Sequence, residues 1–433
     1  MDISVEEVST VNKEITIKAD NNDLGPKFDK ALRRYRKKID MPGFRPGQVP
    51  LSIVKKRYGK EIELEEIQNY VSDIFQNEIV PEHKPIGEPK FEDLKWEDGQ
   101  LEVKIKIGVK PEFELIDLDS VEVDQMVHDV TDDEVQEEVE RQLESKGEWT
   151  ETEDAINKEE HKVVVDAVAL DEEGKPKKED KDEDQELDLR DEKNAPFAEA
   201  LDGKKASDVV KVDLGDDEDK ETFELTVKKV LELKKPELTD ELAGELSNKE
   251  AESVDEYQGL IKSRIQQYYD QAAKDMAKND LSEKLVESHD FEVPDLLVAQ
   301  IQNNYVQQVK GRYGDNLPPD FNEEDYKNEM KDQAVKDAKW YFISEKLQEK
   351  YEIEIDSDDI DAHLAEEAAQ YGLSVDMMQQ FYASSGEQLE QLRMRIRDQK
   401  LFDKLLDEVK INELSKEAYQ EKHQEKDKEQ EEE

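Results

Sequence analysis

The chain lacks cysteine entirely, and its 433 residues contain no unbroken run of eighteen apolar residues. The lack of cysteine excludes disulfide bonds, thiolate metal sites and thiol nucleophiles. A membrane-spanning helix needs about 20 mostly apolar residues, so the sequence predicts a protein with no membrane partner. The first ten residues have neither a basic leader nor an apolar core. This pattern argues against a secretory signal, and we expect a cytoplasmic protein.

Sequence patterns for common catalytic and cofactor sites are absent as well. No Walker-type glycine loop, GxSxG elbow or GxGxxG turn occurs in the sequence. The six histidines are scattered without an HExxH or HxxxH pair. The acidic run from Asp216 to Asp219 lacks the glycine and the terminal glutamate of a calcium loop. We therefore expect a protein that needs no metal and no cofactor.

Acidic residues dominate what is present, with 115 Asp and Glu against 62 Lys and Arg and a formal net charge of −53. They are spread over almost every segment, which is typical of the solvated surface of a protein from a halophile. A need for solubility alone is the alternative explanation. In molar salt the Debye length falls to about 3 Å, so charged contacts would have to be close ones.

The exception is the segment from Lys27 to Lys60, which carries twelve Lys and Arg against two Asp. Pro26 suits the first turn of a helix, and the glycines and prolines between Pro42 and Gly47 predict a loop before a second basic helix near Pro50. One narrow apolar stripe predicts the buried face of the first helix: Phe28, Leu32, Tyr35 and Ile39. Such a density of cations favours binding to phosphates over a merely solvated face.

The sequence GFRPGQVP, from Gly43 to Pro50, is followed by IVKKRYG and resembles the ribosome-docking loop of the bacterial trigger factor family. The family pattern is close to GFRxGKxP, and Gln48 replaces its usual second lysine. The resemblance implies docking to the large ribosomal subunit near the exit of the polypeptide tunnel. The residues that it implies for docking are Gly43, Phe44, Arg45, Pro46, Gly47, Lys55, Lys56 and Arg57.

The remaining patterns predict a multidomain α+β protein in the order that the family shows. Alternating apolar residues near Ile15 and from Leu101 to Val109 predict strands, and a long helix is expected to end near Pro81. The predicted division is an α+β docking domain over 1–115, a linker over 116–149, an FKBP-like domain over 150–236, a helical domain with arms over 237–412 and a frayed charged tail over 413–433. In the linker, Thr131 and Glu134 have the spacing of a capping box.

Residues 150–236 are similar to the family's FKBP-like prolyl isomerase domain, which is rich in β-structure. Strands are expected at Val163–Leu170, Val209–Leu214 and Phe223–Leu233. The segment Asp171–Lys193 contains almost no apolar residues, and we expect it to be a mobile loop.

An isomerase site of this kind surrounds the X-Pro bond with aromatic rings and needs no acid, base or nucleophile. Between Glu151 and Pro236 the candidates for that role are Phe197 and Phe223. Ala167 stands where active relatives carry an aromatic residue. We therefore expect peptidyl-prolyl cis-trans isomerase activity to be weak or absent, with slow turnover supported by the two phenylalanines as the alternative.

The resemblance implies an ATP-independent chaperone that shields nascent and unfolded polypeptides. It is also compatible with a homodimer away from the ribosome. Two alternatives stay open: an enzyme whose main output is prolyl isomerisation, and a helical adaptor that binds another nucleic acid. Candidates for contact with clients are the apolar and aromatic residues of the helical domain: Tyr305, Tyr313, Trp340, Tyr341, Phe342, Met377, Met378, Phe381, Tyr382, Met394 and Phe402.

Overall fold

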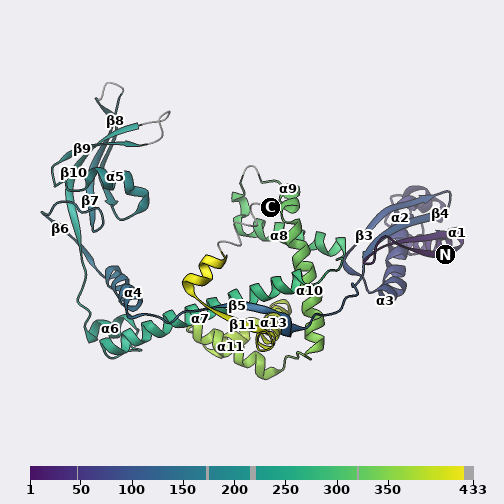
Figure 1. The fold of residues 1–433 in the computed structure, drawn as a ribbon. Coiled ribbons are helices and arrows are strands. Elements are labelled where there is room, and N and C mark those ends of the chain that lie inside the picture. The colour runs from purple at the N-terminus through teal and green to yellow at the C-terminus, as the bar shows by residue number, and fades with distance from the viewer. Residues whose placement is uncertain (46, 172–174, 215–220, 319–320, 424–433) are drawn as a thin grey trace. The chain divides into compact units, whose positions relative to one another are not determined.

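The computed structural model describes residues 1–433 apart from 46, 172–174, 215–220, 319–320 and 424–433. The chain forms two compact units, one made of residues 1–126 with 274–433 and the other of residues 127–273. Both units combine helices and strands (Figure 1), which confirms the predicted multidomain α+β class. Among the described residues, no helix has the length and apolar character needed to cross a membrane.

The N-terminal part of the first unit is built on a four-stranded antiparallel sheet with the order β1-β2-β4-β3. Its strands are β1 (Asp2–Glu7), β2 (Asn12–Asp20), β3 (Ile86–Glu97) and β4 (Gln100–Gly108). Strands β2 and β4 confirm the predictions made from alternating apolar residues. Strand β3 was not predicted, because its register shifts twice against β4 and its apolar residues do not alternate.

Helices fill the connection between β2 and β3. They are α1 (Asn21–Lys38), α2 (Leu51–Ile74), the π-helical segment η1 (Phe75–Ile79) and α3 (Val80–His83). The second basic helix and the long helix expected to end near Pro81 are therefore one nearly continuous run.

The prediction that Pro26 lies in the first turn of a helix is wrong, because α1 begins at Asn21. Asp20 and Asp23 form a capping box there. The carboxylate of Asp20 accepts hydrogen bonds from the amides of Asn22 and Asp23, and the carboxylate of Asp23 accepts one from the amide of Asp20. This capping moves the start of the helix ahead of the proline.

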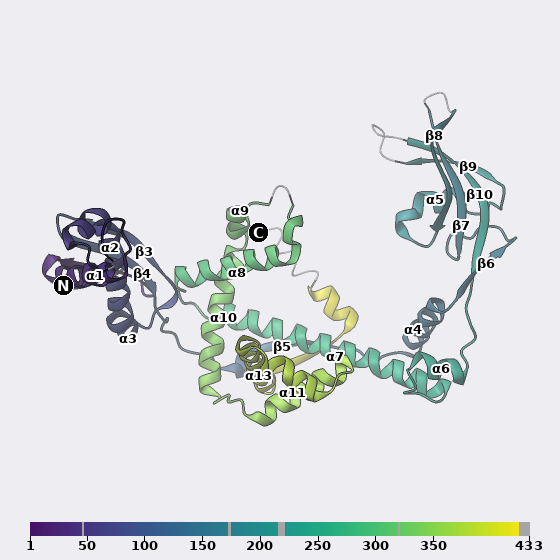
Figure 2. The same cartoon turned by 180° about the vertical axis from the view of Figure 1, so that it is seen from behind.

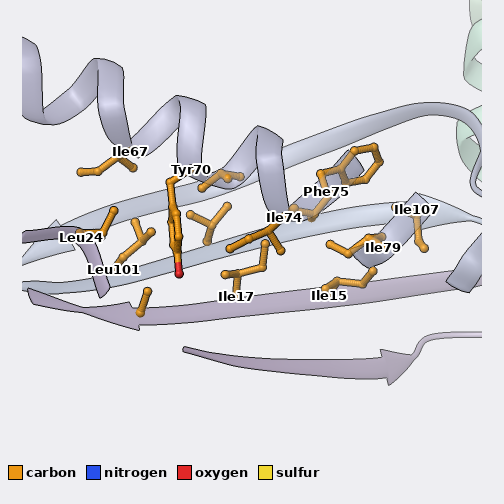
Figure 3. Close-up of a cluster of buried hydrophobic side chains, with 14 of the residues drawn as sticks. Ile15, Ile17, Leu24, Ile67, Tyr70, Ile74, Phe75, Ile79, Leu101 and Ile107 are labelled. Carbon is orange, nitrogen blue, oxygen red and sulfur yellow. The ribbon is translucent and has the colours of Figure 1, made fainter. Parts of the chain in front are cut away.

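Helix α2 covers one face of this sheet (Figure 3). Its side chains Ile67, Tyr70 and Ile74 point toward Ile17 of β2 and Leu101 of β4, and none of the five is more than 8% exposed. Burial of each apolar side chain of this size stabilises the fold by about 1.5–3 kcal/mol. The C-terminal half of α2 is thus fixed on the sheet, while its N-terminal half carries the second arm of the basic segment.

The rest of the first unit is mainly helical and includes the C-terminal half of α7 (Val254–Glu287). The other elements are β5 (Glu122–Val127), α8 (Asp295–Tyr313), α9 (Glu323–Glu329), α10 (Lys331–Lys350), α11 (Ser357–Tyr371), α12 (Val375–Ala383), α13 (Gly386–Leu406) and β11 (Lys410–Ser415). Helices α7, α10 and α13 share a core that contains Leu281, Ile343, Leu347, Leu401 and Leu405.

Two expectations for the C-terminal region are wrong. Helical structure was predicted up to residue 412, but β11 pairs with β5 from Lys410 onward. The tail from residue 413 was predicted to be frayed, but residues 416–423 are helical, with Tyr419 buried. Lys422 explains part of this order, because its Nζ lies 2.5 Å from Oδ2 of the buried Asp124. Residues 424–433 lie outside the described part of the chain.

The second unit contains a sheet with the order β6-β10-β7-β8, in which β9 also pairs with β10. Its elements are α4 (Asp132–Ser145), β6 (Glu148–Thr152), β7 (His161–Leu170), β8 (Pro176–Asp188), α5 (Ala195–Leu201), β9 (Val209–Leu214), β10 (Glu221–Lys234) and α6 (Asp240–Leu246). The views from opposite sides in Figures 1 and 2 show β7, β9 and β10 side by side, with α5 against the sheet.

Strand β8 corrects the prediction of a mobile loop over 171–193. It pairs with β7 in antiparallel register, with Leu187 opposite Val163. Backbone hydrogen bonds to β7 replace the apolar burial that its sequence lacks, and its charged side chains are typical of an edge strand. Leu189, just after the strand, is buried in the core of this unit.

Candidate functional site

The basic segment (residues 27–60) folds as a helical hairpin in which the ends of α1 and α2 pack against each other. The rings of Tyr35 and Tyr58 meet with centroids 5.3 Å apart. Apolar residues from both helices and from the connecting loop form one buried cluster: Ala31, Leu32, Met41, Val49, Val54 and Ile62. This cluster gives the hairpin a small core of its own.

The hairpin loop (residues 39–50) is anchored at both ends. Met41 is 5% exposed and Val49 is 1% exposed, and both belong to the cluster between the helices. Gly43 has φ +90° and Gly47 has φ +78°, a conformation that residues with a Cβ rarely adopt. Between them Phe44 is 37% exposed. The backbone therefore presents the phenylalanine ring at the tip and does not fold it into the hairpin core.

The cations that the motif implies are exposed around this loop. Arg45, Lys55, Lys56 and Arg57 have no carboxylate within ion-pair distance in the described part of the chain. Among the described residues, the hairpin cations that form ion pairs are Lys27 with Asp73 and Arg34 with Glu66. The structure thus brings Gly43, Phe44, Arg45 and Gly47 together at the tip, with Lys55, Lys56 and Arg57 on the first turns of α2. Pro46 lies outside the described residues.

Sequence reasoning missed the two residues that hold the loop, Met41 and Val49. They flank the glycines and prolines almost symmetrically, and a pair of apolar residues at the two ends of a polar loop is the signal that could have revealed them. These anchors, together with the backbone hydrogen bond from Gln48 to Arg45, hold the loop in the conformation that presents Phe44 and Arg45.

The two candidate isomerase residues lie in the second unit on different elements. Phe197 belongs to α5 and Phe223 to β10, and both are half-buried against the same core of Val165, Leu201 and Leu225. Within the described residues, no ring contact joins the two phenylalanines. They serve the packing of α5 on the sheet and do not form an aromatic cup with each other.

The third aromatic residue near this sheet, Trp149, precedes the interval from Glu151 to Pro236 that contains the two candidate phenylalanines. It belongs to β6, and the cations of Lys162 and Arg190 lie over its ring at 4.7 Å and 4.9 Å from the centroid. Ala167 is half-buried in the same core as Phe197. The ring of Trp149 is therefore engaged by cations, and the alanine adds no aromatic surface.

Charged groups near Ala167 are paired with one another. A hydrogen bond from the backbone amide of Asp184 holds the pKa of Asp166 below its usual value, and Lys228 acts in the same direction at 3.4 Å. Lys181 lies 3.8 Å from the same carboxylate. This network stabilises the sheet and provides no free acid or base.

The candidate client-binding residues, which lie between Tyr305 and Phe402, fall into three groups by burial. We call the mainly helical region of residues 274–423 the helical part. Phe342, Met378 and Tyr382 are buried, whereas Tyr305, Trp340 and Phe402 are half-buried. The exposed members, each 47–54% exposed, are Tyr313, Tyr341, Met377, Phe381 and Met394. Further exposed residues that were not among the candidates include Tyr371 at 65% and Leu373 at 46%.

A hollow of about 660 Å³ lies between α10 and α13. Trp340, Tyr341 and Met394 supply its apolar surface, and Asp337 and Asp398 add carboxylates. Burial raises the pKa of Asp398, against the opposing effect of Arg397. The hollow can receive an apolar side chain next to polar groups.

Comparisons with known proteins include the hairpin in a family match. The family model described as "Bacterial trigger factor protein (TF)" matches residues 1–142, and the one described as "Bacterial trigger factor protein (TF) C-terminus" matches residues 253–407. The trigger factor of Chlorobaculum tepidum is 31% identical over 392 residues, which cover 89% of this chain and 92% of that protein. The chain belongs to the trigger factor family.

Other relatives extend the similarity to nearly the whole chain. The trigger factor of Salinibacter ruber is 28% identical over 442 residues, 96% of each protein. A solved structure titled "Promiscuous Substrate Recognition in Folding and Assembly Activities of the Trigger Factor Chaperone" has a TM-score of 0.52 at 24% identity, over 95% of this chain and 100% of that one. This likeness shows a shared fold. Membership of the family confirms the prediction of a trigger-factor-type chaperone.

Proposed function

We propose that the hairpin loop docks on the large ribosomal subunit beside the exit of the polypeptide tunnel. The observation that carries this proposal is the exposed ring of Phe44 on a loop whose ends, Met41 and Val49, are buried. An aromatic ring held at such a tip can enter a pocket of a partner at little entropic cost, because its backbone is already ordered. Arg45 stands next to it and supplies a charge for a phosphate or a carboxylate.

The other docking residues have supporting parts in this proposal. Gly43 and Gly47 shape the loop, and Pro46 completes the motif. Lys55, Lys56 and Arg57 face the same partner from α2 and add cations that no described carboxylate neutralises. Loss of any one of these cations should weaken docking less than loss of Phe44 with Arg45.

The helical part shields nascent and unfolded polypeptides through its exposed apolar side chains. Tyr341 and Met394 border the hollow between α10 and α13, and Met377 and Phe381 project from α12. Methionine adapts to many shapes, and aromatic rings offer a large apolar area, so one surface can hold unrelated segments. No nucleotide is needed for such binding.

We further propose that this chain is a cytoplasmic protein of a halophile, because its net charge is −53. In that setting the docking loop works under strong screening, and contact by Phe44 matters more than long-range attraction. A homodimer away from the ribosome is part of the same proposal. So is the division into a docking domain over 1–115, a linker over 116–149, an FKBP-like domain over 150–236 and a helical domain from 237, whose C-terminal end includes β11 (Lys410–Ser415).

Prolyl isomerase activity is weak or absent in this proposal. Phe197 and Phe223 are engaged in core packing, Trp149 is covered by two cations, and Ala167 takes the place of an aromatic residue. The FKBP-like unit is then a structural or client-holding part of the molecule.

Ribosome pelleting tests the docking. The double variant Phe44→Ala, Arg45→Ala should no longer sediment with ribosomes at the high salt that the protein's acidity suggests. A matched control is Phe91→Ala with Lys90→Ala in β3 of the N-terminal sheet. It also removes one exposed phenylalanine and one exposed cation, but away from the hairpin loop. Unchanged sedimentation of the first variant would remove the proposal.

A further inference from the structure

The solvent face of α1 carries a row of cations outside the docking loop. Lys30, Arg33, Arg34 and Lys37 have the spacing i, i+3, i+4, i+7, which places them on one side of a helix. All four are exposed. At a rise of 1.5 Å per residue the row is about 10 Å long. We call these four residues the α1 row.

The α1 row is mostly uncompensated in a molecule with a large excess of acids. Arg34 pairs with Glu66 at 2.6 Å. In the described part of the chain, Lys30, Arg33 and Lys37 have no carboxylate within 4 Å. A shortage of acids cannot be the reason, because the chain has 115 acidic residues against 62 basic ones.

Stability of the helix does not explain the row. Like charges at i, i+3 and i, i+4 repel and weaken a helix. The helix dipole favours cations in the last turn, which accounts for Lys37. Lys30 and Arg33 lie further back, where the dipole effect has faded. Their placement therefore indicates a binding role.

The composition of the face indicates what it binds. Within the described residues, no large apolar side chain of α1 is classed as exposed, and the ring of Tyr35 is half-buried against Tyr58. A protein partner would be expected to meet an apolar centre, and single-stranded nucleic acid an aromatic platform. A straight row of cations without either fits closely spaced phosphates, as in the backbone of double-helical RNA.

We propose that the α1 row binds the phosphate backbone of double-helical RNA and forms a second contact beside the docking loop. This inference rests on the proposed docking to the ribosome, because that is where α1 would meet RNA. It also explains how docking tolerates Gln48, which leaves the loop without the second lysine of the family pattern. The row supplies cations that the loop lacks.

Salt dependence of ribosome binding tests the row. Each phosphate contact contributes about 0.7–0.9 to the slope of log K against log salt. The triple variant Lys30→Gln, Arg33→Gln, Lys37→Gln should therefore lower the magnitude of this slope by about 2–3 for purified large subunits. A control with the same loss of charge is Lys18→Gln, Lys90→Gln, Lys95→Gln, whose lysines lie on the sheet and are paired. Its slope should match that of the unmodified protein.

The partner is distinguished with defined polyanions and the full-length protein. A labelled 20-base-pair RNA duplex should bind, and the triple variant should lose that binding. Poly-glutamate of equal charge should bind weakly and equally to both proteins. Binding of poly-glutamate in preference to the duplex would overturn the RNA assignment in favour of an acidic protein partner.

The outcomes separate this inference from the docking proposal. If the triple variant leaves the salt dependence of ribosome binding unchanged, the proposal that the α1 row binds RNA is overturned. The docking proposal still stands if Phe44→Ala, Arg45→Ala abolishes sedimentation. If sedimentation survives that double variant, the docking proposal falls, and the duplex experiment alone then decides whether the row binds RNA. Circular dichroism confirms that each variant keeps its helical content.

Discussion

The side chain of Asn12 caps helix α8. Its Oδ1 accepts a hydrogen bond from the backbone amide of Asp295 at 3.1 Å, and its Nδ2 donates to Oδ2 of Asp295 at 3.2 Å. The N-cap position of α8 is Pro294, whose own side chain cannot cap. The capping group therefore comes from β2, far away in the sequence, and ties the sheet to the first turn of the helix.

Replacing Asn12 should loosen the start of α8. Loss of an N-cap costs about 1 kcal/mol, so Asn12→Ala should speed hydrogen exchange in the first turn of α8 about five-fold. Asn303→Ala, on the exposed face of the same helix, should leave exchange there unchanged or slightly slower. Equal exchange in the Asn12 variant and the unmodified protein would show that the contact does not support the helix.

Gly108 tests the same junction by steric means. A Cβ at this position would lie 2.5 Å from Cβ of Pro294 and 2.8 Å from the carbonyl oxygen of Ile86. Gly108→Ala should lower the free energy of unfolding of this region by about 1–3 kcal/mol. Gly25 in α1 has open space around it, and Gly25→Ala should instead raise stability by up to about 1 kcal/mol. A neutral effect at Gly108 would mean that the sheet and α8 separate easily.

Acid should weaken the start of α4. A hydrogen bond from the backbone amide of Thr131, assisted by the imidazole of His128, lowers the pKa of Glu134 to about 2. Since the folded-state pKa lies below the unfolded value of about 4.5, the stabilisation is present above pH 4.5 and is lost as the pH falls toward 2. Hydrogen exchange in α4, corrected for its intrinsic pH dependence, should accelerate across this range.

Glu134→Gln should remove most of that pH dependence, because the amide cannot titrate. Glu140→Gln changes an exposed glutamate of the same helix that is not in the capping box, and it should behave like the unmodified protein. An identical acid response in all three proteins would exclude Glu134 as its source.

Burial predicts opposite effects for neighbouring residues in α12. Met377 and Phe381 are about half exposed, so Met377→Ser with Phe381→Ser should impair suppression of client aggregation with little loss of stability. Met378 is 7% exposed, and Met378→Ala should instead cost about 2–5 kcal/mol of stability. Aggregation assays with a denatured client and thermal unfolding of each variant measure the two effects. If Met377→Ser with Phe381→Ser still suppressed client aggregation fully, α12 would not be part of the surface that binds clients.

Prolyl isomerase turnover should be close to background. In a protease-coupled assay on a proline peptide, the chain should add little to the uncatalysed rate, and Phe197→Ala should change that rate little. Val209→Ala, an exposed change on β9, controls for effects on the sheet. Robust turnover that Phe197→Ala abolishes would overturn the proposal of weak activity.

The sequence predicted those structural features that are determined by residues close to one another in the chain. Alternation from Leu101 to Val109 predicted β4, and the spacing of Thr131 and Glu134 predicted a capping box that the structure contains. The GFRxGxxP pattern led to a loop with an exposed Phe44. Each of these features depends on residues within about ten positions of one another.

Features that depend on remote partners were out of reach. Strand β8 has almost no apolar pattern and exists because β7 offers it hydrogen bonds. Met377 and Met378 are chemically identical neighbours, and only the packing of α11 and α13 decides which of them is buried. That Lys30 and Arg33 form no ion pair with any described carboxylate likewise follows from the folded surface and cannot be read from composition.

Strand β5 finds its partner, β11, near the end of the described chain, with the whole second unit encoded between them. During synthesis, β5 leaves the ribosome long before β11 has been made. Until then, the backbone groups of β5 must form hydrogen bonds with water or with other, temporary partners. A member of a family that protects unfinished chains thus contains a strand whose own partner is made only after the whole second unit.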